Sequence, residues 1–169
     1  LDSYTPNLAP SSQPMRADNR PAIGEQHVAS TVRRSDMQNG NRVYEVQAEF
    51  TTSVLSQTGL GLRMHFDSSV LSLDSVADVL QTGLLQSQVQ DDVHDYDGDP
   101  STDRFIMVAW MDPMGSWPGS YEAQLFKALF TMPKGKGSKN TTIHYSVAGA
   151  AEGMDMSFES VKVGPGKKK

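Results

Sequence analysis

Residues 42–51 read Arg-Val-Tyr-Glu-Val-Gln-Ala-Glu-Phe-Thr, and this stretch decides the fold class. Its apolar and polar side chains alternate, with one face made of Tyr44, Val46, Ala48 and Phe50 and the other of Glu45, Gln47 and Glu49. Successive side chains of a β-strand point to opposite faces of the sheet, whereas a helix repeats every 3.6 residues. The stretch therefore predicts a strand with one buried face.

The same alternation recurs on both sides of this strand. Residues 59–66 place Leu60, Leu62, Met64 and Phe66 on one face. The run 105–110, Phe-Ile-Met-Val-Ala-Trp, is apolar on both faces, as expected of a central strand in a sandwich. Further strand patterns occur at 28–32, 71–76, 123–132, 143–147 and 158–163, the last with an expected register break near Ser160. Val76, Val79, Leu80 and Leu84 have helical spacing, which allows one helical turn there.

About eight or nine short strands separated by turn residues, with little helix, predict an all-β antiparallel β-sandwich. Residues 1–26 contain four prolines among polar side chains and are interpreted as an extended arm or linker. The sandwich is expected to span residues 27–163. Residues 164–169 are interpreted as a flexible tail.

Length and composition exclude several classes of protein. A chain of 169 residues suits a single domain. Its net charge of -5 argues against nucleic-acid binding, which needs a basic surface. The absence of Cys excludes disulfides and cysteine-ligated metal sites. No apolar run approaches the roughly 18 residues of a membrane span, so membrane insertion is not expected.

Three segments together resemble cohesin-type modules. The first is Leu60–Leu73, an apolar strand that runs into the aromatic-Asp turn Phe66-Asp67 and is followed by a Leu-rich strand. Leu125–Thr131 is similar to a later strand of that family, and Ser157–Val163 is similar to its closing strand. The resemblance covers about residues 41–163.

This resemblance implies a jelly-roll sandwich of the kind shared by cohesins and several carbohydrate-binding modules. It also implies a non-catalytic binding or scaffolding module of a secreted or cell-surface protein, acting in adhesion or scaffolding. The partner is a protein or a polysaccharide. A carbohydrate-binding module is the first alternative function, and a small hydrolase with an acidic pair is the second.

Residues 91–103 form the most acidic stretch of the chain, with six Asp in thirteen residues. Ca²⁺ binds six to eight oxygens, and carboxylates at alternate positions can converge on it. The predicted ligands are Asp95, Asp97, Asp99 and Asp103, with Asp91 and Asp92 as further candidates. Pro100 and the lack of a Glu at the twelfth position exclude an EF-hand, so the site would be an irregular loop. The alternative is a solvated loop without an ion.

Aromatic side chains supply the candidates for sugar binding. Trp117 lies between Ser116 and Pro118 in a long turn and is expected to be exposed, with Tyr121 and Tyr96 as further candidates. Trp110 ends an apolar run and is expected in the core. His94 could join the acidic loop in binding a transition metal, although an exposed histidine is the simpler interpretation. No nucleophile or nucleotide-binding motif is present.

Overall fold

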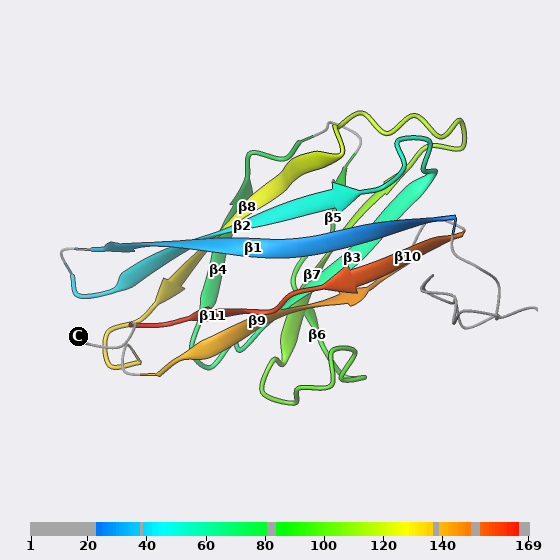
Figure 1. Ribbon diagram of the computed structural model, residues 1–169. Coiled ribbons are helices and arrows are strands. Elements are labelled where there is room, and N and C mark those ends of the chain that lie inside the picture. The colour runs from blue at the N-terminus through cyan, green and yellow to red at the C-terminus, as the bar shows by residue number, and fades with distance from the viewer. Residues whose placement is uncertain (1–22, 38, 81–83, 137–138, 150–152, 166–169) are drawn as a thin grey trace, which may run out of the picture.

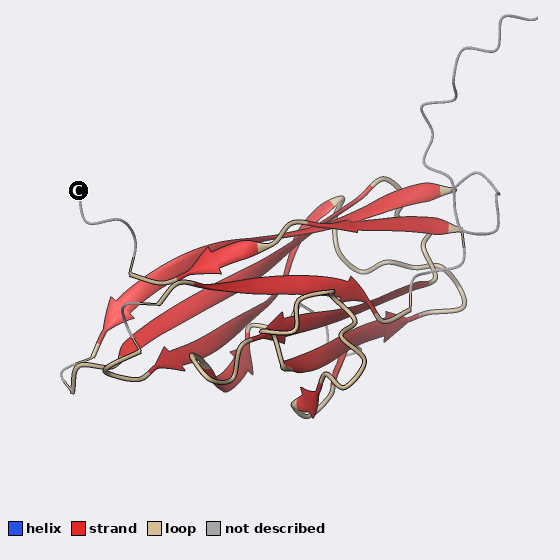
Figure 2. Cartoon of the chain, turned by 90° about the horizontal axis from the view of Figure 1, so that it is seen from below, coloured by secondary structure: helices blue, strands red, loops and turns tan. Residues whose placement is uncertain are grey.

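The computed structural model describes residues 23–165, apart from residue 38 and segments 81–83, 137–138 and 150–152. The described residues form two β-sheets that pack face to face as a sandwich (Figure 1). No helix occurs among them, and the cartoon in Figure 2 consists of strands and loops only. The predicted all-β antiparallel sandwich is therefore confirmed.

The strands follow one another along the chain as β1 (Gly24–Asp36), β2 (Arg42–Thr52), β3 (Gly59–Phe66), β4 (Ser72–Ala77), β5 (Leu85–Gln86), β6 (Gln90–Asp91), β7 (Arg104–Met111), β8 (Glu122–Met132), β9 (Thr141–Val147), β10 (Met154–Phe158) and β11 (Val161–Val163). One sheet has the order β10-β1-β2-β8-β4, and the other has the order β11-β9-β3-β7-β5 with β6 also paired to β7. The two-residue strands β5 and β6 are too short to carry a sequence pattern, which is one reason why the predicted number of strands is lower than the observed number.

Every strand pair in the described residues is antiparallel except the pair of β1 and β10. These two strands run parallel, with Gly24 opposite Met154 at one end and Val28 opposite Phe158 at the other. The register break expected near Ser160 separates β10 from β11. β10 belongs to the five-stranded sheet and β11 to the six-stranded sheet, so the break lets one segment of chain cross between the two layers.

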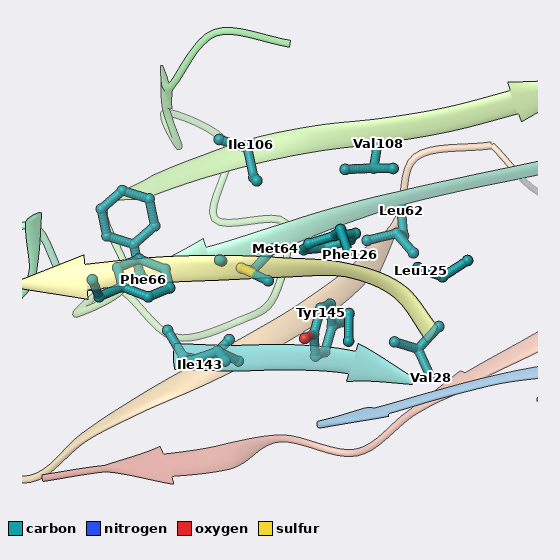
Figure 3. Close-up of a cluster of buried hydrophobic side chains, with 14 of the residues drawn as sticks. Val28, Leu62, Met64, Phe66, Ile106, Val108, Leu125, Phe126, Ile143 and Tyr145 are labelled. Atoms are coloured by element: carbon teal, nitrogen blue, oxygen red, sulfur yellow. The ribbon is translucent and has the colours of Figure 1, made fainter. Parts of the chain in front are cut away.

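The core lies between the two sheets and follows the predicted alternation. The inward side chains of β2 are at most 1% exposed: Tyr44, Val46, Ala48 and Phe50. Figure 3 shows side chains from β3, β7, β8 and β9 pointing toward one another in this layer. Full burial of one such apolar side chain contributes about 1.5–3 kcal/mol, so the interlocked layer dominates the stability of the sandwich.

Two boundary predictions differ from the structure. β1 begins at Gly24, so residues 24–26, which were assigned to the arm, form part of the first strand. The helical spacing between Val76 and Leu84 does not produce a helix in the described residues, because β4 extends to Ala77 and β5 starts at Leu85. Residues 1–22 of the arm and 166–169 of the tail lie outside the described residues. In the described part of the chain, no helix is long and apolar enough to cross a membrane.

Gly61 in β3 marks a close backbone approach, a common reason for a glycine inside a strand. A Cβ added at Gly61 would lie 2.3 Å from the carbonyl oxygen of Gly149. The amide of Ala148 donates to the carbonyl of Gly61 at 3.0 Å, which holds the two segments together.

We expect Gly61→Ala to lower the free energy of unfolding by about 1–3 kcal/mol, the usual cost of forcing extra volume into a packed site. Urea denaturation of the variant and the wild type measures this difference. Ser75→Ala, at an exposed position of β4, is the control and should change stability by about 0.5 kcal/mol at most. Wild-type stability of Gly61→Ala would show that the Gly149 segment moves away freely.

Candidate functional site

The acidic loop, defined here as residues 92–103, joins β6 to β7 and lies at the lower edge of the view in Figure 1. Its ends are closed by the amide of Asp92, which donates to the carbonyl of Asp103 at 2.8 Å. The Asp103 carboxylate accepts hydrogen bonds from the amide and the hydroxyl of Ser68, at 2.7 and 2.6 Å. Desolvation raises the pKa of Asp103, but the Ser68 hydrogen bonds outweigh it and hold the pKa below its usual value. Asp103 therefore anchors the loop to the turn after β3.

Short-range hydrogen bonds shape the middle of the acidic loop. The Asp97 carboxylate accepts from the Thr102 hydroxyl at 2.5 Å and from the Asp99 amide at 3.3 Å. The Asp99 carboxylate accepts from the hydroxyl and amide of Ser101, which lowers the pKa of Asp99. Gly98 has a φ of 74°, a left-handed conformation that glycine adopts without a steric penalty.

The acidic loop packs on the outer face of the six-stranded sheet. Along β3 the side chains of Leu62, Met64 and Phe66 point into the core, so His65 points outward. His65 is nevertheless 0% exposed, because the loop covers it. Its neighbours across the sheet are Phe105 on β7 and His144 on β9.

His65 meets two carboxylates of the loop. Its Nδ1 atom lies 2.9 Å from Oδ2 of Asp92 and 3.9 Å from Oδ2 of Asp97, and all three side chains are at most 1% exposed. Its Nε2 atom lies 2.7 Å from the hydroxyl oxygen of Ser146 on β9. Burial lowers the pKa of His65, and attraction by Asp97 and Asp92 offsets this shift only in part.

Two further contacts tie the loop to the sheet. Nε2 of His144 lies 3.0 Å from Oδ2 of Asp99. The guanidinium of Arg63 lies 3.8 Å from the centre of the Tyr96 ring, a cation–π contact, and also donates to the carbonyl of Val147. Arg63 therefore holds Tyr96 over the outer face of β3 and β9.

In the structure, the carboxylates predicted to bind calcium contact different partners and do not converge on one point. Asp103 binds the Ser68 turn, Asp99 binds Ser101 and His144, and Asp97 lies next to His65. Asp95 is exposed, and Asp91 pairs with Arg104 at 2.8 Å. Among the described residues, the acidic and histidine side chains that come close enough to share one ion are His65, Asp92 and Asp97. Calcium binding by the loop stays a prediction.

The expected exposure of Trp117 is wrong. The residue is 7% exposed, and its ring packs against Phe50 at 5.1 Å and Trp110 at 5.0 Å between ring centres. Its indole N–H donates to the carbonyl of Ser120 at 3.1 Å, so the polar edge of the ring is satisfied inside the protein. Tyr121 is 56% exposed and Tyr96 is 45% exposed. Trp110 is buried as predicted.

Sequence reasoning missed His65 as a member of the site. The alternation in β3 correctly placed it on the face opposite the core, where solvent exposure is the default. The signal that could have indicated burial is Phe105, a large apolar residue that β7 also presents on the outer face. An outward aromatic directly after an acidic loop indicates that the loop folds back to cover it.

An apolar groove lies on the same outer face, beyond Arg63. It has a volume of about 280 Å³ and is lined by residues of β3, β5 and β7 and by the chain after β9, including Gly61, Leu85, Met107, Ala109, Met111 and Gly149. Leu85 is 71% exposed and Met111 is 81% exposed. Contiguous exposed apolar surface of this kind is typical of an interaction site.

Comparison with known proteins identifies the fold class. No protein-family model and no curated protein matches the sequence. Solved structures do match the fold, and they include the seventh ScaB type I cohesin of Pseudobacteroides cellulosolvens, with 11% identity, a TM-score of 0.55, and coverage of 85% of this chain and 97% of that one. A chain of the Coh-OlpA–Doc918 type I cohesin–dockerin complex from Clostridium thermocellum matches with 12% identity, a TM-score of 0.54 and coverage of 82% and 98%.

A cohesin module from a family 33 glycoside hydrolase of Clostridium perfringens also matches, with 14% identity, a TM-score of 0.50 and coverage of 85% and 96%. The protein therefore has a cohesin-type β-sandwich, which confirms the fold that the strand patterns of residues 41–163 indicated. Nearly the whole length of each matching chain is covered.

Proposed function

We propose that this protein is a non-catalytic scaffolding module that holds a protein partner of the dockerin class on the outer face of its six-stranded sheet. The cohesin fold supports this proposal, because matching cohesins were solved as complexes with dockerins. A secreted or cell-surface multidomain protein is the setting that agrees with it. The exposed apolar groove on the six-stranded sheet is the observation that supports this face as the binding surface.

The two outer faces of the sandwich differ in chemistry. The five-stranded sheet presents Glu45, Gln47 and Lys127, and Lys127 lies 4.0 Å from Glu45 and 3.1 Å from Asp78. Those charges are already paired with each other. The six-stranded sheet instead presents Leu85 and Met111 to solvent, and burying them would contribute favourably to binding.

Charge indicates what kind of partner fits. The acidic loop stands at the opposite end of β7 from Met111, about 23 Å away at 3.3–3.4 Å per residue. Asp95 is exposed on the loop, and Asp91 beside it has a side chain 68% exposed. A partner that covers both ends is therefore protein-sized, with an apolar side chain for the groove and basic groups facing the loop.

Two alternatives are less well supported. Sugar binding needs exposed aromatic faces, but Trp117 is buried and Arg63 lies over one face of the Tyr96 ring, which leaves Tyr121 as the remaining exposed candidate. Hydrolysis needs an acidic pair that reaches substrate, but the Asp92 and Asp97 side chains are only 1% exposed. The first observation favours a protein partner over a sugar, and the second favours binding over hydrolysis.

The test measures binding of a panel of purified dockerin modules to the immobilised protein by biolayer interferometry. We expect Met111→Asp to weaken binding at least about 30-fold, the effect of losing a 2 kcal/mol hot spot. Met37→Asp is the matched control, because Met37 is 46% exposed in the turn between β1 and β2 of the other sheet.

The control should bind within about twofold of the wild type, as expected for a residue outside the interface. Equal binding by wild type and Met111→Asp would exclude the groove as the docking surface. Failure of the wild type to bind any dockerin, together with retention on a glycan array, would favour the carbohydrate-binding alternative.

A further inference from the structure

His65 has a ring nitrogen that is buried and has no hydrogen-bond partner. The atom is Nδ1, and it lies close to the carboxylates of Asp92 and Asp97. Although Oδ2 of Asp92 is only 2.9 Å away, it lies off the direction in which an N–H at Nδ1 would point, so no hydrogen bond forms. A polar atom in this state, in a side chain 0% exposed, needs a partner to offset its desolvation.

The hydrogen bond of the second ring nitrogen, Nε2, bears on whether Nδ1 carries a proton. Nε2 lies 2.7 Å from the Ser146 hydroxyl, and an N–H at Nε2 donating to that oxygen leaves a lone pair on Nδ1. Oδ2 of Asp92 then lies 2.9 Å from an unprotonated nitrogen. Two electron-rich atoms at this separation repel each other unless a cation binds both. Metal-binding histidines usually donate their other N–H to a fixed oxygen in this way.

The two carboxylates are held in place by neutral donors that do not cancel their charge. Asp92 accepts from the amide of Tyr96 at 3.2 Å, and Asp97 accepts from the hydroxyl of Thr102 at 2.5 Å. Burying two carboxylates side by side without a compensating charge is costly. A divalent cation would offset that cost and would bind all three groups at once.

The donor set and spacing determine the class of cation. Ligand atoms around a tetrahedral Zn²⁺ are about 3.3 Å apart, given metal–ligand bonds near 2.0–2.1 Å. The Nδ1–oxygen distances of 2.9 and 3.9 Å lie on either side of this value. One imidazole nitrogen with two carboxylates suits a borderline ion such as Zn²⁺, whereas Ca²⁺ takes oxygen ligands.

We infer that His65, Asp92 and Asp97 form a binding site for a divalent transition-metal ion of the Zn²⁺ type, with Ser146 as the residue that orients the imidazole. The ion fixes the acidic loop to β3, since His65 belongs to the sheet and both carboxylates belong to the loop. The predicted calcium site shares Asp97 with this site, and Asp92 as a further candidate, but it also uses the exposed Asp95 and does not use a histidine.

The test titrates ZnCl₂ and, separately, CaCl₂ into EDTA-treated protein, followed by calorimetry and thermal melting. We expect Zn²⁺ to bind with one-to-one stoichiometry and to raise the melting temperature. Asp97→Asn should weaken Zn²⁺ binding by at least about tenfold, the smallest effect expected when even an outer-shell partner is lost. Asp95→Asn, with the same chemical change at an exposed position of the same loop, should leave Zn²⁺ binding unchanged.

Nitrogen-15 NMR of the wild-type histidine side chains provides a readout that does not depend on a variant folding. Zn²⁺ should shift the Nδ1 resonance of His65 and leave that of His94 unchanged. Absence of Zn²⁺ binding, or loss of Zn²⁺ affinity in Asp95→Asn equal to that in Asp97→Asn, would overturn the inference. Stabilisation by Ca²⁺ but not by Zn²⁺ would overturn it too and would support the calcium prediction instead.

Discussion

Trp117→Ala is expected to lower the free energy of unfolding by about 3–5 kcal/mol, the usual range for removing a buried aromatic side chain. Trp117 lies in the loop between β7 and β8, where loss of a side chain would normally have little effect. It is 7% exposed, however, and its ring centre lies about as close to Phe50 as to Trp110. Those neighbours belong to different sheets, β2 and β7.

The tryptophan thus closes one end of the sandwich. Its amide donates to the carbonyl of Leu55 at 3.1 Å, which ties this loop to the one after β2. Truncation would open a cavity beneath both loops and leave the Ser120 carbonyl without its donor. The cavity and the lost hydrogen bond act together, because the rigid strands on either side cannot collapse into the space.

Guanidinium chloride denaturation followed by circular dichroism measures this loss. Tyr121→Ala is the matched control, because Tyr121 lies four residues further on and is 56% exposed. Its truncation should change stability by about 0.5 kcal/mol at most. Wild-type stability of Trp117→Ala, together with lost affinity for a glycan, would instead return Trp117 to the sugar-binding role that its loop position indicated.

The strands and the core could be predicted because alternation is a local property of the sequence. The side chains at every second position of β2 lie in the core, because one face of this strand is buried: Tyr44, Val46, Ala48 and Phe50. The break near Ser160 could also be predicted, since the pattern changes phase there. What local patterns could not show was that the two halves of this segment belong to different sheets.

The candidate site was predicted only in part because it is assembled by packing of a loop on a distant strand. The loop supplies Asp92 and Asp97, which the acidic stretch made visible. His65 and Ser146 come from β3 and β9, and nothing in the spacing of the residues joins them to the loop. The predicted exposure of Trp117 is wrong for the same reason. The turn residues around Trp117 indicate exposure, whereas its burial depends on strands far away in the sequence.

Phe130→Ala is the second change expected to have a large effect, again with a loss of about 3–5 kcal/mol in the free energy of unfolding. Phe130 is 0% exposed in β8 and lies opposite Tyr44 on β2 and Leu73 on β4. Its ring meets that of Phe66 edge-on, with centres 5.3 Å apart. Phe66 belongs to the six-stranded sheet, so this contact joins the two layers.

The neighbouring residue makes this prediction a test of the strand register as well as of the core. Leu129 points to the outer face of the same strand and is half-buried, so Leu129→Ala should cost roughly 1 kcal/mol, about half the value of full burial. Urea denaturation of both variants gives the two losses under the same conditions. A slip of one residue would exchange the two faces of β8. Equal losses, or a larger loss for Leu129→Ala, would therefore contradict the register in which β8 pairs with β2 and β4.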